Sequence, residues 1–280
     1  MNLDGCIHDG WFVVRDYEKL LNKKYLYHFM SSPLIQKQYK TLSAGGVVSN
    51  ISSELVYSVK LNIPSKEEQL KVAKFLSLLD KKIELRSKKI EDLKLFTKKK
   101  ATELLLDLNK ECITESIENI CNIQTGKSNT QDKNDLGVYP FYIRSEKITH
   151  SNKYIFDCEA VLTIGDGNIG KVFFYENGKF DCHQRVYVMN NFRKDVLGKY
   201  FYYYFSNNFY KRAMSMSAKN TVDSVRLEMI AKMKINIPKL EIQNIIITIL
   251  SSFDKKIELE QTKLKKLQEL KKGLMQNMFV

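Results

Sequence analysis

The feature that most constrains the fold is an internal duplication. The segment LNIPSKEEQLKVAKFLSLLDKKIELRSKKIEDL begins at Leu61, and its counterpart INIPKLEIQNIIITILSSFDKKIELEQTKLKKL begins at Ile235 and keeps the same offset throughout. Between Lys60 and Leu93, 16 of 34 positions are identical to their counterparts, and the run DKKIEL occurs in both copies. A repeat of this length predicts two related units rather than a solenoid, whose repeats are about 20 to 50 residues long.

Each copy ends in a long helix with a heptad pattern of apolar residues. The apolar positions are Leu76, Leu79, Ile83, Ile90, Leu93 and Leu104 in the first copy, and Leu250, Phe253, Ile257, Leu264, Leu267, Leu274 and Met278 in the second. Such a seam is buried against another helix, so the two helices are expected to pair. Five polar residues interrupt the seam and are candidates for setting its register, namely Arg86, Thr97, Lys100, Glu260 and Lys271. Each helix would be about 60 Å long and is expected to act as a spacer.

The duplication extends upstream of these helices. Ser43, Ala44 and Val48 match residues 217, 218 and 222, and after a one-residue slip His8 aligns with His183. By this offset the first copy has no counterpart to the front of the second, including the GDGNIG run, whereas the second copy is complete. We therefore expect an α+β fold in four segments: the end of a first mixed α/β domain (1–65), a first helix (66–110), a complete second mixed domain (111–239) and a second helix (240–280).

The composition favours a globular protein with an anionic partner. The chain is 44% hydrophobic and 28% charged, with a net charge of +13 and a pI near 9.3. This charge favours nucleic acid or an acidic protein face, although lysine-rich solvated helix faces account for about half of the excess. No apolar run approaches the roughly 18 residues of a membrane span, and the start MNLDGCIHDGWF lacks the order of a signal peptide. We expect a cytoplasmic protein with no membrane partner.

The five cysteines form no CxxC pair, which argues against a disulfide framework and a zinc ribbon. Cys182 beside His183 is the one pair that suggests a nucleophile or a metal ligand. Catalysis would need a third orienting group and zinc would need more ligands, so small buried cysteines are the favoured interpretation. No catalytic residue, metal or cofactor is expected.

The stretch GDGNIGKVFFYENGKF, which begins at Gly165, contains the glycine spacing of a dinucleotide-binding loop. That loop must follow a strand and open a helix, whose N-terminus binds pyrophosphate. Here VLTI predicts the strand, but KVFFY followed by ENGK predicts a second strand and an Asn-Gly hairpin turn. A kinase loop would require HRD and DFG motifs, which the sequence lacks. The glycines therefore predict a tight turn or a close backbone approach, with DNA phosphate as one candidate neighbour.

With these features in view, the chain resembles the specificity subunit of type I restriction-modification systems. The features that carry the resemblance are the NIPSKEEQ and NIPKLEIQ turns, the DKKIEL helices, the stretch SIENICNIQTGKS and the loop VLTIGDGNIGKV. The resemblance implies target recognition domains joined by two long antiparallel coiled-coil helices. The departure from the family pattern is the missing front of the first recognition domain.

The resemblance implies a protein without its own chemistry. It would bind double-stranded DNA at a bipartite site and carry methyltransferase subunits and a motor-nuclease restriction subunit. A shortened subunit could also pair as a homodimer and read a palindromic split site. Two alternatives stay open: a silent coiled-coil scaffold that docks a partner protein without specific DNA binding, and an enzyme that uses the glycine loop.

Four polar stretches of the complete domain offer groups that read bases or hold phosphates. They begin at Thr125, at Tyr142, at Gly165 and at Ser217, and the third is grouped with the short stretch HQR that begins at His183. The candidates for base contacts are Lys127, Ser128, Asn129, Arg144, Asn168, Gln184, Arg185 and Asn220, and those for phosphate contacts are Lys147, Lys171 and Lys219. His183 is interpreted as a buried structural residue in preference to a DNA contact. The aromatic run KYFYYYFSNNFYKR from Lys199 predicts a packed helix rather than a base-stacking platform.

Overall fold

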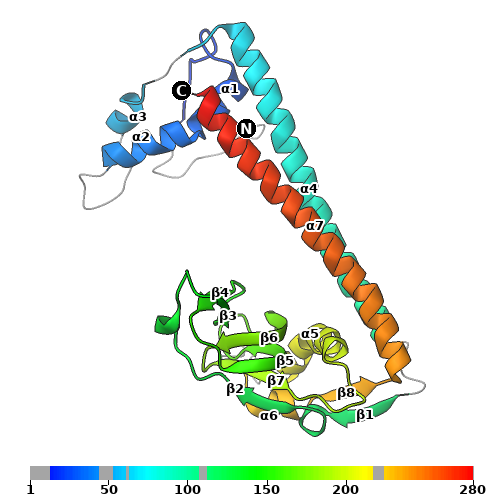
Figure 1. Cartoon of the computed structure of the whole chain (residues 1–280). Helices are drawn as coiled ribbons and strands as arrows, with labels where there is room; N and C mark the ends of the chain where they lie inside the picture. The colour runs from blue at the N-terminus through cyan, green and yellow to red at the C-terminus, as the bar shows by residue number, and fades with distance from the viewer. Residues whose placement is uncertain (1–12, 44–52, 61–62, 107–111, 217–223, 280) are drawn as a thin grey trace. The chain divides into compact units, whose positions relative to one another are not determined.

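The structure is a computed structural model of the chain that describes residues 13–43, 53–60, 63–106, 112–216 and 224–279. It divides into two compact units (Figure 1). Unit 1 comprises Met1–Asp92 and Ile257–Val280, and unit 2 comprises Leu93–Lys256. The two long helices, α4 (Lys66–Leu106) and α7 (Leu240–Met278), run through both units. In the described part of the chain, no helix is long and apolar enough to cross a membrane.

Unit 1 is built from helices in its described residues. Three short helices precede α4, namely α1 (Lys23–Met30), α2 (Pro33–Ser43) and α3 (Ser53–Tyr57). Helix α1 starts at Asn22, whose side-chain oxygen accepts hydrogen bonds from the first free backbone N–H groups of the helix. The core of the unit joins α1 and α2 to both long helices through Tyr25, Phe29, Ile35, Leu76, Met275 and Phe279.

In its described residues, unit 2 contains two sheets and two shorter helices. A two-stranded sheet pairs β1 (Ile113–Ser116) with β8 (Lys234–Ile237). A six-stranded sheet has the order β2-β7-β5-β6-β3-β4, with strands β2 (Asn122–Thr125), β3 (Tyr139–Tyr142), β4 (Thr149–Ser151), β5 (Phe156–Ile164), β6 (Phe173–Cys182) and β7 (Val186–Asn190). All its pairs are antiparallel except β3 with β6. Two 3₁₀ turns follow β1 and β2, namely η2 (Ile117–Asn119) and η3 (Thr130–Asp132).

The aromatic run folds as helix α5 (Gly198–Ser215), which packs on the six-stranded sheet in Figure 1. Tyr200, Phe201, Phe205 and Phe209 are fully buried in the main core of unit 2. The interpretation of this run as a packed helix is therefore confirmed. A short helix, α6 (Leu227–Ala231), and β8 then lead to Pro238 and α7.

One prediction about local structure is wrong. The sequence predicts a hairpin turn at the Asn177-Gly178 pair, but β6 continues through it, with Asn177 opposite Glu159 and Gly178 opposite Cys158. The physical reason is that β5 is long enough to pair with β6 on both sides of this dipeptide, from Phe173 to Phe180. Gly178 has a φ of +144°, a backbone conformation that favours glycine within the strand.

The long helices pair in antiparallel fashion within each unit. In unit 1, Lys271 forms an ion pair with Asp80, and further along α4 the side chains of Arg86 and Lys89 bind Glu260. In unit 2, Ala101 and Leu105 share a core with Ile246 and Leu250, and Phe96 packs edge-on against Phe253. The α+β fold class with paired antiparallel helices is thus confirmed. The division into four segments and the spacer role of the helices stay predictions.

Three of the five polar seam residues form ion pairs across the helix pair. Arg86 and Glu260 occupy equivalent positions of the duplication and contact each other. Lys271 reaches Asp80. Thr97 instead donates to the Leu93 carbonyl of its own helix, and Lys100 pairs with Glu103. Opposite charges at equivalent positions favour pairing of α4 with α7 over pairing of either helix with itself.

The duplication is repeated in the hydrogen bonds that fix the start of each long helix. Gln69 is fully buried in unit 1, where its amide donates to the carbonyls of Leu20 and Pro64 and its oxygen accepts from the Asn22 amide. Gln243 is fully buried in unit 2 and makes the equivalent bonds. Its amide donates to the carbonyls of Asp195 and Pro238, and its oxygen accepts from the Leu197 backbone N–H. One glutamine in each unit therefore ties the proline turn to the start of an earlier helix, α1 in unit 1 and α5 in unit 2.

Candidate nucleic-acid interface

The candidate interface is a group of loops in unit 2 that connect strands of the six-stranded sheet and contact one another. Four connections meet there: residues 126–129 after β2, 143–148 between β3 and β4, 165–172 between β5 and β6, and 183–185 between β6 and β7. Their backbones are bonded together. Gly165 donates to the Arg185 carbonyl at 2.7 Å, His183 donates to the Tyr142 carbonyl at 2.9 Å, and Gln184 donates to the Ser128 carbonyl at 2.9 Å.

The glycine loop is a strand-to-strand connection that packs against protein. It leaves β5 at Gly165 and enters β6, so no helix follows to bind pyrophosphate. Gly170 has a φ of +65°, and a Cβ there would lie 2.9 Å from the Tyr210 Cα of α5. A Cβ on Gly165 would lie 2.8 Å from the Arg185 carbonyl oxygen. The expected close backbone approach is therefore present, and the neighbours are α5 and the β6–β7 loop.

Asp166 in this loop joins two arginines from different connections. Arg144 Nη1 lies 3.2 Å and Arg185 Nη1 lies 3.3 Å from the same Asp166 Oδ2 atom. The Asp166 side chain is 18% exposed, whereas those of Arg144 and Arg185 are 47% and 61% exposed. One carboxylate oxygen therefore holds two guanidinium groups at the surface, with most of their hydrogen-bond donors directed elsewhere.

Ser128 is placed differently from the other candidates. It is 1% exposed, and its hydroxyl lies 2.8 Å from both carboxylate oxygens of the fully buried Asp181. Asp181 also accepts from the Cys182 amide at 2.8 Å. The serine hydroxyl is committed to this buried carboxyl group, because a buried polar group needs a hydrogen-bond partner. The Ser128 hydroxyl is therefore not available to contact a base.

The environment of Cys182 and His183 favours the structural interpretation of both. Burial raises the pKa of the fully buried Cys182 thiol, which opposes formation of a nucleophilic thiolate. His183 is 5% exposed, and its Nδ1 accepts from the Arg185 amide at 3.1 Å. Burial and then the nearby Arg144 lower the pKa of His183, so the ring is neutral near pH 7. Among the described residues, no group of three or more His, Cys, Asp and Glu side chains could hold a metal ion.

The remaining candidates occupy the surface of the same loops or fall outside the described residues. Lys127, Lys147, Asn168, Lys171 and Gln184 are exposed. Asn129 is half-buried and caps η3, where its side chain accepts from the Asp132 amide and the Asp132 carboxylate accepts from the Asn129 amide. Lys171 lies over the Tyr210 ring at 5.5 Å from its centroid. Lys219, Asn220 and the aligned His8 lie outside the described residues.

Asp166 is the residue that the sequence interpretation missed. It is far along the chain from both Arg144 and Arg185, so no local spacing connects the three side chains. The one available signal was an acidic residue enclosed by two glycines in a loop otherwise rich in candidate contacts. The polar stretch that begins at Ser217 ends near the β5–β6 loop. Ser224 forms an isolated antiparallel β-bridge with Asp166, and the Val225 N–H donates to the Gly165 carbonyl at 2.7 Å.

Comparison with known protein families identifies the architecture. A family model described as the type I restriction modification DNA specificity domain matches residues 6–95 and 109–269. The chain belongs to this family. The two matched regions together cover most of the chain and include part of each copy of the duplication.

Individual members of the specificity-domain family are distant relatives of the chain. The EcoDI specificity subunit of Escherichia coli is 23% identical over 163 residues, which cover 58% of this chain and 36% of that protein. A protein of Mycoplasma pneumoniae named as a putative type I specificity subunit is 26% identical over 227 residues, covering 75% of this chain and 80% of that protein. The chain thus spans little more than a third of the Escherichia coli relative.

Solved structures show the same fold. The crystal structure of a type I restriction-modification S subunit from M. genitalium aligns with a TM-score of 0.66 at 17% identity, covering 93% of this chain and 73% of that one. A second structure, from work on complex assembly and conformational transition of the type I system, aligns with a TM-score of 0.58 at 17% identity and covers 93% of this chain and 72% of that one. At this identity the likeness concerns the fold alone.

Proposed function

We propose that the chain is a sequence-specific DNA-binding subunit that directs methyltransferase and restriction subunits to a bipartite DNA site. The observation that carries the proposal is the convergence of Arg144 and Arg185 on Asp166, which joins three loops of unit 2. Membership of the specificity-domain family supports the same function. In this proposal the chain has no catalytic residue and needs no cofactor or metal, because the chemistry belongs to its partners.

The geometry of the arginine pair suits the reading of base edges. An arginine that binds O6 and N7 of guanine is the commonest specific contact in the major groove, and it requires an oriented guanidinium plane. Asp166 restrains Arg144 and Arg185 through one oxygen atom, so less side-chain freedom is lost when DNA binds. The two guanidinium groups remain about half exposed and available to the bases.

The exposed residues around this pair divide into two proposed roles. Asn168 lies in the same loop as Asp166, Gln184 lies beside Arg185 in the β6–β7 loop, and amide side chains read adenine edges. Lys147 and Lys171 are proposed to hold phosphates, which would fix the register on the duplex without reading sequence. Lys127, Asn129 and Asn220 remain proposed base contacts, and Lys219 remains a proposed phosphate contact.

The partner subunits are proposed to dock on the paired long helices. Both copies of DKKIEL lie on these helices, and exposed apolar residues accompany them, such as Leu85 in α4 and Leu259 in α7 at equivalent positions. Each copy would therefore present a similar surface to a similar partner. This arrangement fits one methyltransferase subunit for each copy of the duplication.

Coexpression with the methyltransferase subunit from the same genome tests the proposal. Mapping of methylated bases should reveal one sequence motif, of which unit 2 reads one half. Methyltransferase that copurifies with the chain but modifies DNA without sequence preference would support the scaffold alternative instead. Nucleotide binding by the purified chain would support the enzyme alternative.

A second experiment tests the arginine pair directly. Arg185→Ala should weaken binding to the cognate half-site about 5- to 150-fold, because a base contact of this kind contributes about 1–3 kcal/mol of discrimination. Binding to random DNA should weaken far less. Lys194→Ala is the matched control, since Lys194 is also exposed but follows β7 at the far end from Arg185. Equal losses on cognate and random DNA would reassign Arg185 to a phosphate contact.

A further inference from the structure

A fifth segment of unit 2, residues 224–226, is bonded to the loops of the candidate interface. Its first residue, Ser224, forms an antiparallel β-bridge with Asp166. The N–H of the next residue, Val225, donates to the Gly165 carbonyl at 2.7 Å. The segment is therefore fixed to the same loop backbone that carries the carboxylate of the arginine pair.

The packing of this segment directs Arg226 to the surface. Val225 is 5% exposed in the main core of unit 2, and its carbonyl accepts from the Tyr187 hydroxyl of β7 at 3.1 Å. Neighbouring residues of an extended chain point to opposite sides, and Ser224 and Arg226 are both exposed. Arg226 has an extended backbone, with φ of −96° and ψ of 147°, and its side chain makes no capping hydrogen bond to α6. Its guanidinium group therefore lies on the solvent side of the segment.

The five segments together form a strongly cationic surface. They contain six lysine and arginine side chains but two carboxylates, in residues 126–129, 143–148, 165–172, 183–185 and 224–226. The Asp166 carboxylate already binds both Arg144 and Arg185. Most of the positive charge on this surface is thus left for an anionic partner, as expected for a surface that binds DNA phosphates.

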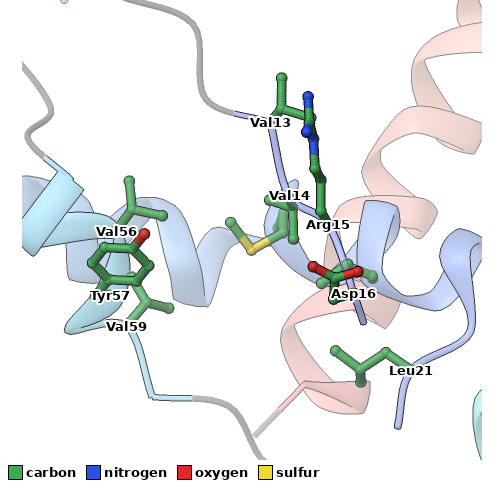
Figure 2. Close-up of a pocket in the computed structure, with 10 residues that line it drawn as sticks. Val13, Val14, Arg15, Asp16, Leu21, Val56, Tyr57 and Val59 are labelled. Atoms are coloured by element: carbon green, nitrogen blue, oxygen red, sulfur yellow. The ribbon is translucent and has the colours of Figure 1, made fainter. Parts of the chain in front are cut away.

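The cavity of unit 1 has a different character. It has a volume of about 490 Å³, and Figure 2 shows its apolar lining, which includes Val13, Val14, Leu21, Val56 and Val59. The charged residues of its described lining are Arg15 and Asp16, whose charges are opposite. Charge therefore gives this cavity no preference for a polyanion, in contrast to the surface around Asp166.

We propose that Arg226 binds a DNA phosphate beside the bases that Arg144 and Arg185 contact, and thereby fixes the register of this arginine pair on the duplex. The inference rests on the proposed function. A phosphate accepts two parallel hydrogen bonds from a guanidinium group, and such a contact positions a protein without reading sequence. Because residues 224–226 are bonded to Gly165 and Asp166, the phosphate contact is held at a fixed place relative to the pair.

The salt dependence of binding to a random-sequence DNA duplex tests the inference with the full chain. Each phosphate contact contributes about 0.9 to the slope of log affinity against log salt concentration. In Arg226→Ala this slope should decrease by about 0.9, so the loss of affinity between about 50 and 200 mM salt should shrink about 3.5-fold. Arg226→Lys keeps the charge and should keep the slope. The melting temperature of Arg226→Ala should match that of the unaltered chain, because the side chain is exposed and caps no helix.

Lys194→Ala is the matched control, because it removes one positive charge from an exposed side chain that follows β7 at the far end from Arg185. Its slope should equal that of the unaltered chain. An unchanged slope in Arg226→Ala would overturn the inference, and so would a changed methylation motif at an unchanged slope, which would make Arg226 a base contact.

The proposed function fails in a different way. An unaltered chain that binds its methylated motif and random duplex equally would overturn the proposed function. If the unaltered chain does prefer its motif and Arg226→Ala keeps the slope, the inference about Arg226 alone is overturned.

Discussion

The buried glutamine of unit 2 gives the sharpest test of how the duplicated fold is held together. Gln243→Leu preserves most of the side-chain volume but removes three hydrogen bonds, of 2.7 Å to the Asp195 carbonyl, 2.8 Å to the Pro238 carbonyl and 2.9 Å from the Leu197 amide. The substitution leaves two carbonyls and one N–H group without partners beside a fully buried side chain.

The expected loss of stability follows from these three groups. A typical hydrogen bond contributes about 0.5–1.5 kcal/mol net, and each buried group left unsatisfied costs about 1–3 kcal/mol. Partial access of water to the Asp195 and Leu197 groups lowers the sum, so we expect a loss of about 3–5 kcal/mol for unit 2. For a domain of this size, each kcal/mol lowers the melting temperature by about 2–4 °C. The melting temperature of unit 2 should therefore fall by about 10 °C.

Hydrogen exchange locates the effect within the chain. In Gln243→Leu, peptides that include residues 195–201 should exchange faster, and peptides that include residues 20–26 should be unchanged. Gln69→Leu should produce the opposite pattern, because Gln69 makes the equivalent three bonds in unit 1. Gln261→Leu on the exposed face of α7 serves as the control and should alter neither set of peptides.

Two outcomes would contradict this expectation. If Gln243→Leu melts at the same temperature as the unaltered chain and residues 195–201 exchange no faster, then these bonds do not hold α5 to the start of α7. Equal acceleration in both units after either substitution would show that the effect is global and would remove the equivalence of the two glutamines.

Three further predictions follow from other contacts. Gly170→Ala should lower the free energy of unfolding in urea by more than the roughly 1–2 kcal/mol of left-handed strain expected for Gly167→Ala, because a Cβ meets the α5 backbone only at Gly170; equal losses would contradict this. Arg86→Glu should lower the melting temperature by opposing Glu260, and adding Glu260→Arg should restore only part of it because Lys89 and Lys263 also contact Glu260; no recovery would contradict the pairing. Burial lowers the pKa of His28 and His183 below 6.5, so the unfolded chain binds more protons and stability should fall as the pH drops below about 6.5; His183→Gln should reduce this slope in thermal unfolding between pH 7.5 and 5.5.

The elements that sequence patterns predicted correctly are those that local periodicity specifies. The heptad seam predicted both long helices, and the aromatic run of α5 was recognised as a buried helical face. The Asn177-Gly178 turn failed because a local signal for a hairpin was overridden by continuous pairing with β5. A dipeptide does not reveal whether a partner strand extends past it.

The sequence predicted which loops form the candidate site, but only some of the residues that belong to it. The polar stretches pointed to the loops of unit 2 that contact one another, and Arg144, Asn168, Gln184 and Arg185 lie there at the surface. Ser128 belongs to the same stretch, but the sequence gives no sign that Asp181 is buried opposite it. A polar residue in a loop can either face water or satisfy a buried charge, and only the packing decides which.

Identity at a fixed offset and a period near 3.5 are properties of the chain, so the duplication, the two seams and the equivalence of their polar residues can be read without any coordinates. The packing of strands and helices, in contrast, brings arginines from two loops to one carboxylate. It also makes one glutamine in each unit tie the proline turn to the start of an earlier helix, α1 in unit 1 and α5 in unit 2. These contacts depend on the strand order β2-β7-β5-β6-β3-β4 and on how the helices pack, which bring together residues 19 to 49 positions apart in the chain. No spacing in the sequence specifies which of many polar residues will meet at such distances.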